Sequence, residues 1–290
     1  MSYQGFFFRQ NARRNDRKRD RAIPLPEGIT ECRNIRYGDE GKWNLLDVYY
    51  PIATTARLPT IVSVHGGGYV YGTKEVYRRY CMDLARRGFA VVNFNYRLAP
   101  QWKFPTPLAD TNAVLEWVCR NAETYHLDPQ RLFLVGDSAG AQIASQYAAI
   151  ATNPAYGALF DFTVPDISIR ALGLNCGLYD AAALAAGKRV FIAKDYLGKL
   201  SATDLRLQVL GHICADYPAA HITTACCDFL RENARPMAEF LRAKGIRVVL
   251  NCYGKDSDKQ IGHVFHVNIS LPEAKKCNDE QCKFFLSTLE

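Results

Sequence analysis

The chain has 290 residues, of which 48% are hydrophobic and 22% are charged, and its formal net charge is +7. This balance is typical of a globular protein and excludes a disordered chain. No apolar run approaches the roughly 20 residues that would cross a bilayer, so a membrane-spanning protein is excluded as well.

Most of the net charge lies at the N-terminus. Residues 1–22 hold seven basic and two acidic side chains, a net charge of +5, while the rest of the chain is nearly neutral. A neutral body argues against a nucleic-acid groove, and no nucleic-acid partner is expected. Such an arm could touch RNA or anionic lipid, but blocks of like charge are most often solvated. We expect residues 1–30 to form a basic arm, with a place in a cap as an open alternative, apart from one domain over residues 31–290.

The N-terminus and the cysteines both indicate a cytoplasmic protein. The apolar patch Phe6–Phe8 precedes the basic cluster and no longer apolar stretch follows it, unlike a secretory signal. The ten cysteines include no CxxC pair, and several stand inside apolar runs, as in a reduced protein. Cys277 and Cys282 have no histidine at zinc-site spacing. We therefore expect no metal and no cofactor.

Beyond the arm, the predicted elements alternate between strands and helices. Strands are expected at 43–50, 60–64, 89–94, 131–135, 168–174, 221–225 and 247–252, and helices at 75–86, 107–125, 139–150, 231–243 and 279–288. This alternation predicts an α/β fold whose mostly parallel sheet is covered by helices on both faces. The alanine-rich, helical segment at about 179–217 breaks the rhythm. It predicts a small helical cap inserted over the carboxyl edge of the sheet, where such folds bind ligands.

The first motif that carries chemistry is His65-Gly66-Gly67-Gly68, directly after a predicted strand. Consecutive glycines let backbone N–H groups converge on one point, and such groups stabilise the oxyanion of a tetrahedral intermediate. No GKS or GKT follows, which disfavours a phosphate-binding loop. We assign Gly67 and Gly68 to an oxyanion hole, and expect His65 to brace the loop.

The second motif is the pentapeptide GDSAG at residues 136–140. It follows a predicted strand and opens a predicted helix, the context in which GxSxG presents a nucleophilic serine on a sharp turn. A simple helix-capping turn is the alternative. We predict that Ser138 is the nucleophile and that the N–H of Ala139 completes the oxyanion hole.

The acid and the base are expected further along the chain. Asp228 follows the predicted strand 221–225 and can accept the Nδ1–H of an imidazole, although it would also suit a helix cap. Asp256 and Asp258 are rivals, but they stand in a charged segment typical of a solvated loop. For the base we prefer His263 in the polar loop after the last predicted strand, with His266 as the alternative.

Together these motifs resemble the hormone-sensitive-lipase-like branch of the α/β-hydrolases. The resemblance rests on HGGG at 65–68, YRLAP at 96–100, FP at 104–105 with Asp110, GDSAG at 136–140, Asp228, and GHVF at 262–265, and it covers roughly residues 43–290. It implies an α/β-hydrolase fold with a cap, carboxylesterase or lipase chemistry on short to medium acyl chains, and a Ser138–His263–Asp228 triad.

The expected function is therefore that of a serine carboxylesterase acting on a small-molecule ester. Three alternatives stay open: an esterase for acetylated or feruloylated oligosaccharides, an amidase or peptidase with the same triad, and a non-catalytic receptor for a small ligand. A homodimer is possible.

Overall fold

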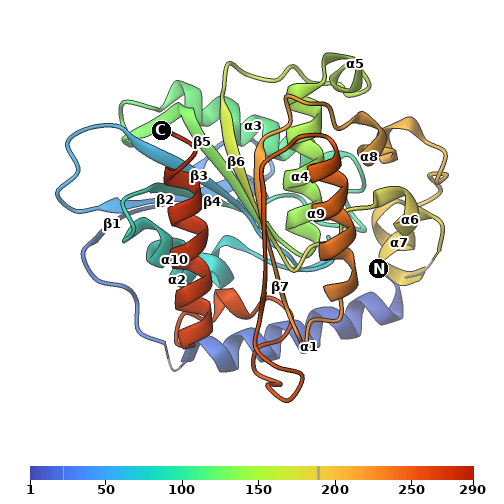
Figure 1. Cartoon of the computed structure of the whole chain (residues 1–290), viewed down its shortest axis with the longest axis horizontal. Coiled ribbons are helices and arrows are strands. Elements are labelled where there is room, and N and C mark those ends of the chain that lie inside the picture. Colours follow the sequence, from blue (N-terminus) through green and yellow to red (C-terminus); the bar gives the residue numbers. More distant parts are fainter. Residues whose placement is uncertain (22, 188–189) are drawn as a thin grey trace.

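One mostly parallel sheet organises the protein in this computed structural model, which describes residues 1–21, 23–187 and 190–290 (Figure 1). Within the described residues the sheet has eight strands in the order β1-β2-β4-β3-β5-β6-β7-β8. The strands are β1 (Ile29–Arg36), β2 (Leu45–Pro51), β3 (Leu58–Val64), β4 (Ala90–Phe94), β5 (Leu127–Asp137), β6 (Ile169–Asn175), β7 (Ala219–Ala225) and β8 (Val248–Tyr253).

The direction of the strands places the functional loops together. β1 and β2 are antiparallel to their neighbours, and the run from β4 through β3, β5, β6 and β7 to β8 is parallel. In parallel strands all carboxyl ends meet at one edge. The loops that follow β3, β5, β7 and β8 therefore converge there.

Helices cover both faces of the sheet (Figure 1). The longer helices are α1 (Tyr3–Arg21), α2 (Lys74–Ala85), α3 (Thr106–Arg120), α4 (Ala139–Thr152), α9 (Ala234–Ala243) and α10 (Pro272–Leu286). Apolar side chains of α3, α4 and α9 join one buried cluster, and those of α2 and α10 join another. Because the strands between these clusters are buried on both faces, they are almost continuously apolar. The expected α/β-hydrolase architecture is confirmed.

Shorter helical pieces connect these elements. They are α5 (Pro154–Gly157), α6 (Ala181–Ala185), α7 (Val190–Tyr196), α8 (Val209–His212) and the 3₁₀ turns η1 (Gly41–Asn44), η2 (Leu205–Leu207), η3 (Arg231–Asn233) and η4 (Phe265–Val267). The segment 179–217, in which a cap was expected, contains α6, α7, η2 and α8 between β6 and β7. Residues 188–189 of that segment, and residue 22 of the basic arm, lie outside the described residues.

The N-terminal arm differs from the simplest expectation of a solvated segment. It forms α1, which lies along one edge of the molecule beneath the sheet in Figure 1. Gly5 is buried, and the backbone N–H and hydroxyl of Ser2 both donate to the Asp195 carboxylate of α7. Arg9 donates to the carbonyl of Val70 at 2.6 Å. One side of this helix is therefore packed, for which the charge count gave no warning.

The sequence also missed β1 and placed the start of the last helix too late. β1 is a polar edge strand with a register shift between Cys32 and Ile35, so it lacks an apolar alternation. α10 begins at Pro272, a favoured first residue of a helix, rather than at 279. No helix in the described part of the chain combines the length and the apolar character needed to cross a bilayer.

Candidate active site

Ser138 of the pentapeptide is the single residue between a strand and a helix. β5 ends at Asp137 and α4 begins at Ala139, so the chain turns at Ser138 with φ 53° and ψ −116°. A Cβ on Gly136 would lie 2.3 Å from the carbonyl oxygen of Gly140, and one on Gly140 would lie 2.1 Å from that of Val64. Both positions therefore require glycine, and the serine is held in a strained conformation typical of a nucleophile.

The predicted acid and the preferred base are hydrogen-bonded to each other. The Nδ1 of His263 lies 2.7 Å from Oδ1 of Asp228. The backbones of their loops meet in an isolated parallel bridge between Cys227 and Gly262, just past the ends of β7 and β8. Residues 35 apart in sequence are thus brought together by the pairing of two neighbouring strands.

Asp228 is buried and well supplied with donors. Its carboxylate also accepts from the hydroxyl of Thr224 at 3.0 Å and from the N–H of Leu230 at 2.9 Å. Burial opposes its charge, but the hydrogen bond and the positive charge of His263 outweigh burial and lower the pKa of Asp228. An ionised Asp228 can accept the Nδ1–H of a neutral imidazole, an arrangement in which Nε2 is free to accept a proton.

The rival residues lie elsewhere. His266 is fully buried in η4 beside Tyr80, and burial lowers its pKa to about 3. His221 is buried within β7, where burial lowers its pKa to about 4. The side chain of Asp256 is 86% exposed and pairs with Arg231 on the surface. Neither histidine has a carboxylate partner in the described residues, in contrast to His263.

A group of possible metal ligands overlaps the acid and base. One ligand atom each from Cys176, Asp228 and His263 lies within 4.8 Å of the others. Burial, followed by the nearby charge of Asp228, raises the pKa of the Cys176 thiol well above its usual range. A protonated thiol is a poor metal ligand. These residues suit a hydrogen-bonded acid and base better than a metal centre.

The glycine loop after β3 is shaped for close backbone approach. Gly67 has φ 113°, and a Cβ there would lie 2.2 Å from the carbonyl oxygen of Tyr71. Val70 and Tyr71 both donate their N–H groups to the carbonyl of Gly67, and within the described residues the N–H groups of Gly67 and Gly68 donate to no backbone carbonyl. Ala139 is the first residue of α4, where helix N–H groups have no intrahelical acceptor. Gly67, Gly68 and Ser138 line the same pocket, and Ala139 directly follows Ser138 in the chain.

His65 braces this loop. Its Nδ1 lies 2.7 Å from the carbonyl oxygen of Gly66, and its ring stacks on Tyr96 at 4.1 Å. Burial lowers the pKa of His65 to about 4 and keeps the ring neutral. A side chain on Gly72 would come within 2.2 Å of that ring, so the loop closes tightly around it.

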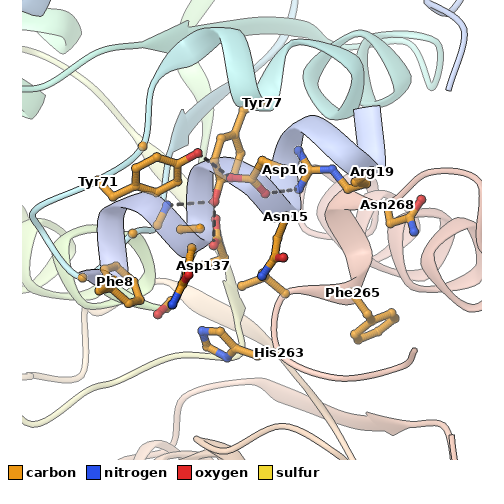
Figure 2. A pocket seen from close by; sticks show the side chains of 18 of the residues that line it. Phe8, Asn15, Asp16, Arg19, Tyr71, Tyr77, Asp137, His263, Phe265 and Asn268 are labelled. Carbon is orange, nitrogen blue, oxygen red and sulfur yellow. Dashed lines mark hydrogen bonds and ion pairs between the residues drawn. The ribbon is translucent and has the colours of Figure 1, made fainter. Parts of the chain in front are cut away.

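Asp137 is a buried acid that sequence reasoning did not single out. It accepts a hydrogen bond of 2.8 Å from the Tyr77 hydroxyl, which itself accepts one from the N–H of Gly66. Burial raises the pKa of Asp137 to about 7, although Tyr77 and His263 act in the opposite direction. A Cβ on Gly66 would lie 2.3 Å from this carboxylate. Asp137 thereby connects the serine turn to the glycine loop, as Figure 2 shows.

Ser138 and His263 both line one pocket of about 820 Å³, within the range of small-molecule sites. The same pocket is lined by Gly67, Gly68 and Ile192 of α7. Six further lining residues come from the N-terminal helix α1: Phe8, Asn11, Ala12, Asn15, Asp16 and Arg19. The basic arm, for which a place in a cap was one of the expectations, thus forms one wall of the pocket.

A polar cluster connects α1 to the glycine loop (Figure 2). The hydroxyl of Tyr71 donates to Asp16 at 2.7 Å, and Arg19 donates to Asp16 at 3.0 Å and to the carbonyl of Val76 at 3.1 Å. Burial raises the pKa of Asp16, while Arg19 and Tyr71 counteract that effect. The inward residues Gly5, Phe8, Ala12, Asp16 and Arg19 recur every three or four positions. Only Phe8 and Ala12 of these five are apolar, so no apolar stripe marked this helix face in the sequence.

Comparisons with known proteins agree with this architecture. The model of a protein family described as "alpha/beta hydrolase fold" matches residues 61–267 of this chain. The carboxylesterase NlhH of Mycobacterium tuberculosis is 31% identical over 245 residues, covering 78% of this chain and 74% of NlhH. The structure of esterase B from Lactobacillus rhamnosis superposes with a TM-score of 0.86 at 26% identity, over 96% of this chain and 92% of that one.

The ethyl acetate hydrolase of Pseudomonas putida is 42% identical, but only over 86 residues, which are 29% of this chain and 27% of that enzyme. A probable isoprenylcysteine alpha-carbonyl methylesterase of Oryza sativa is 37% identical over 114 residues, again 27% of its own length. The chain thus spans about a quarter of these two relatives and about three quarters of NlhH. Taken with the serine turn, the glycine loop and the matched fold, these likenesses show that the chain belongs to the α/β-hydrolase fold family, in its hormone-sensitive-lipase-like branch of esterases and lipases.

Proposed function

We propose that the protein is a serine carboxylesterase that hydrolyses small esters with short to medium acyl chains. The observation that carries this proposal is the 2.7 Å contact between His263 and Asp228 beside a pocket that Ser138 also lines. The relatives named above support it, since each is called an esterase or a hydrolase.

In the proposed mechanism, His263 Nε2 accepts the proton of Ser138 as its oxygen attacks the ester carbonyl carbon. The N–H groups of Gly67, Gly68 and Ala139 stabilise the negative charge on the carbonyl oxygen. His263 then gives its proton to the departing alcohol, and water releases the acid from the acyl-enzyme by the same steps. Asp228 stays ionised and holds the imidazole throughout.

We further propose that α1 and the segment 179–217 act together as the cap. Phe8 of α1 and Ile192 of α7 both approach Gly68, because a Cβ on that glycine would lie 3.5 Å and 3.2 Å from them. The side chains nearest the proposed oxyanion hole are therefore apolar and suit an acyl chain. Asn11, Asn15 and Asp16 offer polar contacts to the rest of the substrate.

Two further proposals concern the cellular context. All ten cysteines are free, and those at 81, 176, 277 and 282 are buried, which fits a reducing, cytoplasmic compartment. We also propose, from the sequence alone, that the protein forms a homodimer. Light scattering would measure the molar mass in solution, which for a dimer is twice the 32.6 kDa of one chain.

The central test is hydrolysis of p-nitrophenyl esters from acetate to decanoate by the wild type and by Ser138→Ala. We expect the wild type to prefer the shorter chains and the variant to lose at least about 10⁴-fold in kcat, since the nucleophile is gone. A folded wild type that cleaves no ester in the series would overturn the proposal. Amide substrates and acetylated oligosaccharides, assayed alongside, distinguish the alternatives.

A further inference from the structure

We propose that the outward face of α1 binds the surface of an anionic membrane. α1 has one face that packs on the protein and an opposite face that is exposed to solvent. Its inward residues pack on the body of the protein and line the pocket, as described above. The opposite side presents a single stripe at alternating spacings of four and three, which runs the length of the helix: Tyr3, Phe7, Gln10, Arg14, Arg17 and Arg21, all of them exposed.

The N-terminal end of this stripe is aromatic. Among the described residues, nine large hydrophobic side chains are exposed, and five of them stand in the first 25 residues: Met1, Tyr3, Phe6, Phe7 and Leu25. The rings of Tyr3 and Phe7 are 4.6 Å apart and those of Phe6 and Phe7 5.9 Å apart, so they form one patch. Exposed apolar patches mark contact surfaces, and aromatic rings are favoured at the boundary between water and lipid.

The C-terminal part of the outward face of α1 is cationic. The exposed cations are Arg13, Arg14, Arg17, Lys18 and Arg21. Both acidic residues of the helix, Asp16 and Asp20, pair with Arg19 on its inward side. Within the described chain, none of the five exposed cations forms an ion pair. Uncompensated cations beside exposed aromatic rings are the pattern of a helix that lies on an anionic lipid surface.

The distribution of charge and aromatic rings favours a membrane over RNA. Single-stranded nucleic acid is bound in positively charged grooves that follow its backbone. Here the exposed cations stand on a single helix, next to exposed aromatic rings, and the rest of the chain is nearly neutral, so no basic groove continues beyond α1 within the described residues. A flat lipid surface can contact both the aromatic and the cationic parts of such a helix at once.

Docking in this orientation would bring the pocket close to the lipid. Asn11 and Asn15 are exposed and line the pocket, and each lies one residue beyond the stripe positions Gln10 and Arg14. An ester dissolved in the membrane would then reach Ser138 along the side of α1. This consequence rests on the proposed function, whereas the binding itself does not.

The test uses the full chain and sedimentation with vesicles of phosphatidylcholine, with and without phosphatidylglycerol. We expect binding to the anionic vesicles only, and weaker binding at higher salt. The triple variant R14Q/R17Q/R21Q should bind about 100-fold more weakly, because each cation near an anionic surface contributes about fivefold. None of these arginines lines the pocket, so hydrolysis of a soluble ester should be unchanged.

The matched control R235Q/R242Q/K244Q removes the same charge from exposed positions in and just after α9, and should bind as the wild type does. F6S/F7S should weaken binding while keeping all the cations. Ser138→Ala should bind normally, which separates this proposal from the catalytic one. Equal binding to both kinds of vesicle, an equal loss in the control, or binding to an RNA oligonucleotide without binding to vesicles would overturn the proposal.

Discussion

Two sides of the same pocket are held in place by different forces. On one side the serine turn and the glycine loop are fixed by backbone, since added Cβ atoms on Gly67, Gly136 and Gly140 would come within 2.3 Å of backbone oxygens. On the other side α1 is docked mainly by hydrogen bonds from side chains such as Ser2, Arg9 and Tyr71. Backbone geometry tolerates no displacement, whereas side-chain contacts can open individually. We therefore expect changes on the first side to affect the chemical step, and changes on the second to affect substrate binding.

The largest effect is expected from Asp228→Asn. The amide NH₂ of asparagine would donate to Nδ1 of His263, which keeps the ring in place but puts its proton on Nε2, and the positive charge of the imidazolium is no longer stabilised. We expect kcat to fall about 10⁴-fold with little change in KM. Asp256→Asn is the matched control, because it removes an exposed carboxylate from the neighbouring loop. A similar loss of activity in both variants would refute the assignment of the acid.

Gly67→Ala should come next. The new methyl group would meet the carbonyl oxygen of Tyr71, and φ 113° is unfavourable for alanine. Displacing one oxyanion donor should lower kcat about 10²- to 10³-fold. Gly88→Ala imposes the same kind of backbone strain, at φ 90°, but its methyl group would meet nothing within 4 Å. It should lower the melting temperature and leave kcat intact. If Gly67→Ala behaves like Gly88→Ala, the loop is structural rather than catalytic.

The serine turn and the glycine loop, which are held by backbone contacts, were also the part of the pocket that could be predicted from the sequence. Gly136, Ser138 and Gly140 constrain one another within five residues, and the apolar strands on either side are continuous. The pairing of Asp228 with His263 followed from their places after adjacent strands. Asp137 escaped notice because its significance depends on Tyr77 and Gly66, whose proximity only the folded structure reveals.

The helix side was harder to predict. The contacts that dock α1 join residues far apart in sequence, such as Ser2 with Asp195 and Asp16 with Tyr71. No local pattern encodes such pairs, and the cations on the outward face dominated the composition of the segment. β1 was missed for a related reason, since an edge strand exposed to solvent needs no apolar alternation.

The buried carboxyl of Asp137, next to the serine turn, should make the free energy of unfolding depend on pH. Its pKa of about 7 in the folded protein lies above the ordinary value of 3.8, so between these pH values the folded protein keeps a proton that the unfolded chain has released. Its contribution to the free energy of unfolding therefore falls as the pH rises from about 4 to 7. At about 1.4 kcal/mol per pKa unit the upper limit is about 4 kcal/mol, and relaxation around the charge reduces it.

Asp137→Asn should remove this dependence while keeping an oxygen that accepts from Tyr77. Urea unfolding at pH 5 and at pH 8 measures the free energy of unfolding of each variant. The variant should gain stability relative to the wild type as the pH rises, and Asp161→Asn, at an exposed position, should not. If the difference between Asp137→Asn and the wild type were independent of pH, the burial of a titrating carboxyl at this position would be ruled out.

The smallest effect is expected on the helix side, from Tyr71→Phe. The variant loses one hydrogen bond to the Asp16 carboxylate, which should weaken the docking of α1 by about 1.5 kcal/mol. Because α1 can open without unfolding the sheet, amide hydrogen exchange in residues 3–21 should become about tenfold faster, while that of the strands stays unchanged. KM should rise severalfold at nearly constant kcat, since α1 lines the pocket but holds none of the reacting groups. Tyr3→Phe deletes the same oxygen from a side chain that is 78% exposed and should change neither quantity. A fall in kcat without faster exchange in α1 would mean that Tyr71 acts through the glycine loop, and the division of labour between the two sides of the pocket would not hold.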